Sequence, residues 1–357
     1  MSTKALFIEH LRRERLTLLR PDTPPEIVAR ALELLGLDDP SLDRWARSRT
    51  SLISLPHASP NVFDPRTRVG WFAGEMQRQV SGLHHVRVVL THTNFSDLGW
   101  RPYAWWYLSD GVVRRHRLFS RNKKQKHCVI SSRPPLDVVP EGMTGADLSA
   151  ARAAIWGSDL AASFMLIGAV IERAAGMIPG PVATYLPLTM LVSFVRELAS
   201  RASSPDEQGA SPAAWCGRLI ATTQGRRVAP DGTLRECSGD RAEVLDNYGN
   251  LASLALLEDA QVLGGAKMAG YWPDVEAVAA RIQGTAPEGF ALPCVLMVPE
   301  LDLLSFAGPS PDVAAQLERQ GVRYSQGLAV AEHGCFAARG RVFGAAALTG
   351  TDITEEA

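Results

Sequence analysis

The stretch "WCGRLIATTQGRRVAPDGTLRE", residues 215–236, joins a short amphipathic segment to a tight turn. Trp215 and Leu219 lie four positions apart, so they mark the buried side of a helix. Ser211 is placed to cap this helix and Pro212 to begin it, because serine accepts from free N–H groups and proline suits a first helical turn. The stretch therefore predicts a helix that leads into a turn.

The end of this helix is expected at Gly225, because glycine adopts the left-handed conformation that terminates helices. Arg226 and Arg227 follow at once, and "APDG" (229–232) then turns the chain. Two cations that only complemented the helix end would contribute a few tenths to about 1 kcal/mol, and one arginine would suffice. Adjacent guanidiniums held between a helix and a turn suit bidentate contact with phosphates. We therefore expect this pair to bind a nucleic-acid backbone.

The composition is that of a folded globular protein. The chain has 357 residues, of which 46% are hydrophobic and 21% charged, and its formal net charge is −1. This length is enough for two lobes of ordinary domain size. Near-neutrality argues against a uniform basic coat, but a local basic stripe is sufficient for nucleic-acid binding.

Compartment signals are few. The five cysteines are scattered singly without a CxxC pair, which disfavours a zinc site or a disulfide framework and fits a reducing compartment. The N-terminal segment is charged throughout and lacks an apolar signal core. The longest apolar run, 160–171, is too short to cross a bilayer, so we expect a buried helix and no membrane insertion.

The chain as a whole is expected to be mainly helical with one small β patch. Thr23 is expected to cap a helix that has Glu26 in a capping box and ends at Gly36. Short β-branched and aromatic runs between about 84 and 131, with a turn at 109–111, predict strands and a hairpin. Further helices are expected over residues 4–19, 38–48, 144–202 with a break at "GMIPGP" (176–181) and, with glycine interruptions, 242–283.

The most basic segment is "VVRRHRLFSRNKKQKH", residues 112–127, and no acidic residue occurs between Gly111 and Leu136. It predicts either a phosphate-contacting hairpin or a solvated loop. The aromatic residues before it, within 100–107, could stack bases, but adjacent aromatics on strands more often pack into cores. The basic candidates in this segment are Arg114, Arg115, Arg117, Lys123 and Lys124.

Catalytic and metal signatures are weak. His84, His85 and His92 have no carboxylate or cysteine at ligand spacing, which disfavours a metal site. The chain has no GxSxG, HExxH or P-loop motif, and no GxGxxG between a strand and a helix. The cluster "EHGCFAARG" (332–340) holds a histidine and a cysteine, but sequence neighbours rarely form a catalytic dyad. We therefore expect no enzymatic activity, no cofactor and no metal.

Several segments resemble nucleoproteins of nonsegmented negative-strand RNA viruses. "TTQGRRV" (222–228), preceded by Trp215, is similar to a Trp…Thr-Gln-Gln-Arg-Arg-Val segment in the N-terminal lobe of paramyxovirus nucleoproteins. "LTMLVSFVRELASRASSPD" (188–206) is similar to the apolar helix that precedes that segment. "YGNLASLALL" (248–257), followed by "GGAKMAGYWPD" (264–274), resembles the signature of the C-terminal lobe.

This resemblance implies a mainly α, two-lobed helical nucleoprotein with a small β-hairpin patch in the N-lobe and terminal exchange arms. The implied division is an N-terminal arm, an N-lobe, a C-lobe and a C-terminal tail, at residues 1–20, 21–238, 239–340 and 341–357. It also implies single-stranded RNA held by its backbone, in a sequence-independent manner, between the lobes. The expected RNA contacts are Thr223, Gln224, Arg226, Arg227 and Lys267, with Arg114, Arg115, Arg117, Lys123 and Lys124 as a rim.

The same resemblance implies a homo-oligomeric filament, a helical nucleocapsid that serves as polymerase template. Its partners would be a viral phosphoprotein and a polymerase, and its locations the virion and the host cytoplasm, with the nucleus as an alternative. Two other classes stay open. An icosahedral coat protein explains the neutral charge but not the arginine pair, and a nucleic-acid-acting enzyme would use the 332–340 cluster or the histidines.

Overall fold

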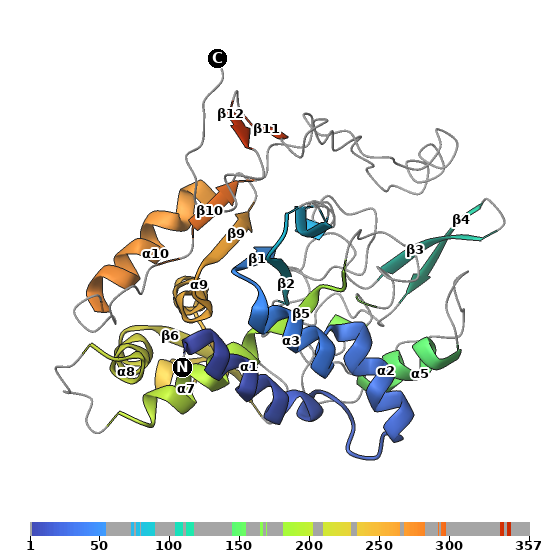
Figure 1. Cartoon of the computed structure of the whole chain (residues 1–357). Helices are drawn as coiled ribbons and strands as arrows, with labels where there is room; N and C mark the ends of the chain where they lie inside the picture. Colours follow the sequence, from blue (N-terminus) through green and yellow to red (C-terminus); the bar gives the residue numbers. More distant parts are fainter. Residues whose placement is uncertain are drawn as a thin grey trace.

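The centre of the fold is a wholly parallel five-stranded sheet with strand order β10-β9-β1-β2-β5 (Figure 1). Three of its strands precede residue 238 and two follow it, so the sheet joins both sides of the expected lobe boundary. The strands are β1 (Thr50–Ser54), β2 (Leu83–Val89), β5 (Thr184–Pro187), β9 (Ala260–Gly264) and β10 (Cys294–Met297). The computed structural model describes residues 2–54, 73–74, 76–78, 80–89, 104–109, 112–117, 145–154, 165–166, 169, 181–202, 210–229, 234–264, 268–282, 292, 294–297, 336–338 and 341–343.

Two of these strands replace expected helix. β5 and β9 fall within 144–202 and 242–283, so the prediction of helix is wrong at those positions. Both are short, largely apolar and buried, and periodicity cannot distinguish such runs from buried helix. Glu258 and Asp259 have positive φ angles of 45° and 42°, which turn the backbone sharply between η3 (Leu254–Leu257) and β9.

One face of the sheet, here called the apolar face, packs on α3 (Asp39–Arg47). Trp45 of α3 donates from Nε1 to Ser51 Oγ at 2.8 Å and stacks on His84 with ring centroids 5.6 Å apart. His84 Nε2 lies 2.8 Å from Thr184 Oγ1, whose hydroxyl donates to the carbonyl of Gly36. Residues on this face that join the main hydrophobic core are Ile53, Val86, Val88, Leu186, Ala260 and Val262.

The first helix, α1 (Thr3–Glu14), packs inside its own chain. Phe7 is fully buried, and its ring centroid lies 5.2 Å from that of Phe194 in α7 (Leu188–Ala199). The backbone N–H and hydroxyl of Thr3 both donate to Glu258 Oε1, at 2.7 and 2.9 Å. Residues 1–20 were expected to be an exchange arm, whereas in this structure the apolar side of α1 covers the chain's own core.

The helix α2 (Pro25–Leu35) ends as expected but begins differently. Gly36 terminates it in the left-handed conformation, with φ of 64°, which confirms the predicted end. The predicted cap at Thr23 is wrong, because Pro24 occupies the N-cap position and no side chain caps the helix there. The tandem prolines shift the helix start by one residue, so Thr23 lies outside it.

The helix α8 (Pro212–Thr222) confirms the prediction from Ser211, whose hydroxyl accepts from the N–H of Ala214 at 3.1 Å. Trp215 and Leu219 are buried, as their spacing predicts. The helix ends at Thr223, which is extended with φ of −108°. The chain then enters a three-stranded sheet of order β7-β6-β8. Its strands are β6 (Gln224–Val228), β7 (Leu234–Ser238) and β8 (Val244–Leu245).

Gly225 therefore has a different role from the expected helix terminator. It is a buried strand residue, and a Cβ there would lie 2.2 Å from Ala242 Cβ and 2.5 Å from the carbonyl oxygen of Val244. The close approach of these segments, not a left-handed backbone, requires glycine at this position. The two arginines that follow lie on a strand rather than at a helix exit.

The remaining elements include two hairpins, and Figure 1 places both of them apart from α1, α7 and α8. β3 (Ala104–Ser109) and β4 (Val112–Arg117) pair antiparallel, which confirms the predicted hairpin. β11 (Phe336–Ala338) pairs with β12 (Arg341–Phe343).

Within the described ranges, no helix is long and apolar enough to cross a membrane. The other helices are η1 (Arg15–Leu18), α5 (Gly145–Ala154), η2 (Gly239–Arg241), α9 (Asn247–Ser253) and α10 (Met268–Ile282).

Candidate functional site

The hairpin formed by β6 and β7, here called the β6–β7 ribbon, carries the expected arginine pair. Successive side chains of a strand point to opposite faces, so Arg226 and Arg227 do not act side by side. Arg226 is half-buried and lies opposite Glu236, whereas Arg227 is exposed and lies opposite Arg235. The strand thus places Arg226 and Arg227 on opposite faces, and the hairpin pairs Arg227 with Arg235.

The cross-strand pair Arg227 and Arg235 is the most cationic feature of the ribbon. Both residues are exposed, and directly opposed side chains have Cβ atoms about 4.5–5.5 Å apart. Two exposed guanidiniums on adjacent strands present N–H donors that suit a bound anion such as a phosphate. Sequence reasoning missed Arg235, because a turn at 229–232 would set Arg227 opposite residue 234, whereas the strands pair Val228 with Leu234 and leave five residues, 229–233, between them.

The residues before the arginines are held by local hydrogen bonds. Thr223 is 3% exposed, and its hydroxyl donates to the carbonyl of Leu219 at 2.7 Å. Gln224 is exposed, but its backbone N–H donates to Asp246 Oδ2 at 3.2 Å and its carbonyl accepts from the N–H of Asp246. The side chain of Gln224 therefore lies on the surface near the ribbon, whereas Thr223 serves to end α8.

The other expected RNA contacts are only partly placed. β4 carries Arg114, Arg115 and Arg117, and its register sets Arg115 opposite Trp106 and Arg114 opposite Tyr107. Lys123, Lys124 and Lys267 lie outside the described residues, as do His92 and the polar residues Glu332, His333 and Cys335 of the 332–340 cluster.

A second cluster lies on the central sheet, on the face opposite the apolar one. Ser54 Oγ lies 2.9 Å from His85 Nε2, and both residues are buried. Burial, Arg87 and His84 together hold the pKa of His85 well below its usual value, so the ring is neutral at physiological pH. A serine and a histidine at this distance resemble a nucleophile and its base, but such a low pKa makes His85 a weak base.

The two adjacent histidines are separated by the sheet. His84 lies on the apolar face, where burial first, and then the charges of Arg44 and Lys4, lower its pKa to about 3. His85 lies on the other face, because neighbouring strand residues alternate. Among the described residues, no group of three or more potential metal ligands occurs.

A third polar cluster ties α1 to α7. His10 Nδ1 lies 2.7 Å from Glu197 Oε2, and His10 Nε2 lies 2.8 Å from Ser193 Oγ. The Ser193 hydroxyl donates to a carbonyl one turn earlier in α7, so it accepts from His10 rather than presenting a proton to it. Burial raises the pKa of Glu197, but the hydrogen bond with His10 and the charges of Arg13 and Arg201 lower it overall. The cluster therefore joins two helices instead of activating a serine.

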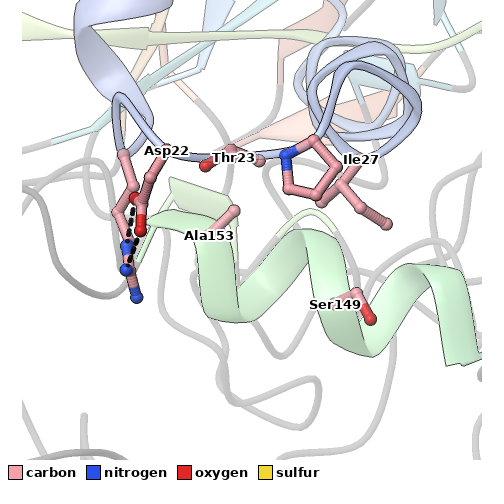
Figure 2. Close-up of a pocket in the computed structure, with 7 residues that line it drawn as sticks. Asp22, Thr23, Ile27, Ser149 and Ala153 are labelled. Atoms are coloured by element: carbon pink, nitrogen blue, oxygen red, sulfur yellow. Dashed lines mark hydrogen bonds and ion pairs between the residues drawn. The ribbon is translucent and has the colours of Figure 1, made fainter.

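A pocket of about 370 Å³ lies between the start of α2 and α5 (Figure 2). The guanidinium of Arg20 forms two hydrogen bonds with the carboxylate of Asp22, which neutralises the charge at this end. Figure 2 shows Thr23 and Ile27 on the α2 side and Ser149 and Ala153 on α5. None of the described residues that line this pocket belongs to the expected RNA site.

Comparison with known proteins returns no relative. No protein-family model matches the chain, and neither a curated protein nor a solved structure does.

Proposed function

We propose that this chain binds the backbone of single-stranded RNA on the β6–β7 ribbon, in a sequence-independent manner and without catalysis. The observation that carries the proposal is the antiparallel register that sets exposed Arg227 opposite exposed Arg235. Two guanidiniums on adjacent strands can bind one phosphate together, or two successive phosphates, through bidentate hydrogen bonds. Phosphate contacts position a strand but carry no base information.

The likeness of 222–228 and 248–274 to nucleoprotein segments supports RNA as the polymer and self-assembly as its consequence. In this fuller form of the proposal, the chain coats genomic RNA as a nucleocapsid protein. A phosphoprotein and a polymerase would then be its partners. RNA-bearing rings or helices in electron micrographs of the purified protein would support this form, and protein that stays monomeric with added RNA would count against it.

The test of RNA binding uses two double variants that each remove two arginines, so they lose the same charge at different positions. Arg227→Ala with Arg235→Ala removes the cross-strand pair, and Arg226→Ala with Arg241→Ala removes two other arginines close by. Each phosphate contact to a single strand contributes about −0.7 to the slope of log affinity against log salt. The first variant should flatten that slope by roughly 1.4, whereas the second should leave it nearly unchanged.

Fluorescence anisotropy with a short single-stranded RNA across a salt series gives both slopes. Circular dichroism of each variant checks that the fold is intact. Equal slopes in the wild type and the Arg227/Arg235 variant would refute the proposal. A change confined to the Arg226/Arg241 variant would place the RNA on the other face of the ribbon.

A further inference from the structure

The first turn of α1 contacts two places in the chain where strands of the central sheet begin. Lys4 Nζ donates to the carbonyl of Ser48 at 2.6 Å and to its Oγ at 3.2 Å, and Ser48 lies two residues before β1. Thr3 donates from its backbone N–H and its hydroxyl to Oε1 of Glu258, which lies two residues before β9. Thr3 and Lys4, here called the α1 clip, therefore hold the amino ends of β1 and β9 together.

The two strand starts are neighbours in the sheet, although they are far apart in the sequence. β1 and β9 pair in parallel from Ser51 and Ala260 onward, and β10 pairs with the other edge of β9. Burial lowers the pKa of Lys4, whereas the negative charges of Asp259 and Glu258 act in the opposite direction. Both carboxylates therefore lie close enough to Lys4 to favour its charged form. The clip thus acts on the start of β9 through hydrogen bonds and through charge.

The chain enters β9 through a strained turn. Glu258 has φ of 45° and ψ of 144°, and Asp259 has φ of 42°. In the part of the chain that the structure describes, these are the only non-glycine residues with positive φ. A side chain with a Cβ disfavours this region, and residues persist there only when the surrounding contacts fix them. The two hydrogen bonds from Thr3 end on Glu258 itself, so the clip supplies such contacts.

We propose that the α1 clip is a conformational latch for β9 and β10. While Thr3 holds the carboxylate of Glu258, the turn keeps its strained conformation and β9 stays in register with β1. When the first turn of α1 moves away, the turn relaxes to negative φ, and β9 loosens from β1 together with β10. Displacement of α1 and opening of this side of the sheet are then one event. The latch does not involve the β6–β7 ribbon, so its test is independent of RNA binding.

The test measures amide hydrogen exchange of the full chain by mass spectrometry under native conditions. Glu258→Ala removes the acceptor of both Thr3 hydrogen bonds and retains a side chain that disfavours positive φ. Hydrogen bonds to a charged group are strong, so exchange of the β9 amides and of the first turn of α1 should rise about tenfold or more. The β2 amides should change by less than about twofold, because β2 lies on the other side of β1.

Glu258→Gly distinguishes a latch from a contact that is simply lost. Glycine adopts positive φ without a steric cost, so β9 exchange should stay within about threefold of the wild type while the first turn of α1 loosens. Thr3→Val removes the hydroxyl but retains the backbone bond, and it should raise β9 exchange less than Glu258→Ala does. The matched control is Glu9→Ala, which removes an exposed carboxylate of α1 that pairs with Arg12 and should leave β9 exchange unchanged.

Three results would overturn the proposal. The first is equal β9 exchange in the wild type and Glu258→Ala, and the second is an equal increase in Glu258→Ala and Glu258→Gly. The third is an increase that is as large in β2 as in β9, because it would report lower global stability rather than opening of one side of the sheet. If Glu258→Ala does not fold, unchanged β9 exchange in Thr3→Val overturns the proposal instead.

Discussion

Replacing Phe7 by alanine tests whether α1 belongs to the core of its own chain. Phe7 is fully buried, and its ring lies 5.2 Å from Phe194 and 5.9 Å from Trp45 by centroids. Removing a fully buried phenylalanine ring costs about 3–5 kcal/mol, since packing and burial are lost and a cavity remains. That is a large share of a typical free energy of unfolding of about 5–15 kcal/mol. The melting temperature should fall by roughly 6–10 °C, given about 2 °C per kcal/mol for a chain of this size.

The assay is urea unfolding followed by circular dichroism, at a low and a high protein concentration. If α1 packs within its own chain, the loss is the same at both concentrations. If α1 were an exchange arm seated on a neighbour, the loss would depend on concentration, because assembly and folding would be linked. Leu16→Ala is the control, since Leu16 is 56% exposed and should change stability by less than about 0.5 kcal/mol. A Phe7→Ala effect below about 1 kcal/mol, or one that scales with concentration, would refute the reasoning.

Two further predictions concern the ribbon and the α1–α7 contact. Gly225→Ala should lower the free energy of unfolding by more than about 1 kcal/mol, the average cost of a single substitution, because the added Cβ would overlap Ala242 and Val244. A neutral or stabilising result in thermal unfolding would mean that these segments do not approach so closely. The folded-state pKa of Glu197 is lowered, so its contribution to stability is present above the unfolded pKa and should be lost as pH falls through the folded value. Stability curves of the wild type and Glu197→Gln should therefore converge in acid, and curves that stay parallel down to acid unfolding would contradict the assignment.

Local chemistry was enough to predict several elements from the sequence. Ser211 and Pro212 define the start of α8, Gly36 ends α2, and the turn signal at 109–111 correctly predicts that β3 and β4 pair antiparallel. Each of these signals acts within a few residues of where it occurs, through a cap, a positive φ or a tight turn. The structure confirms these elements because little outside them competes with the local preference.

The candidate RNA residues show where local reasoning stops. From the sequence, Arg226 and Arg227 were interpreted as one adjacent pair held between a helix end and a turn. The strand places them on opposite faces and supplies Arg235 as the neighbour of Arg227. The error began at Gly225, since glycine serves equally at a helix end and at a close approach between strands.

The sequence by itself determined the start of α8, the end of α2 and the β3–β4 hairpin, because their signals lie in adjacent residues. Only the tertiary structure decided that β1 pairs with β9 across about 200 residues of chain, and that His85 and Gln261 share one sheet face. Short apolar runs are compatible with strand or helix, and pairing is chosen by burial against distant partners. The pairing of Arg227 with Arg235 is local to one hairpin, whereas the residues of the central sheet assemble only when strands distant in the sequence pair.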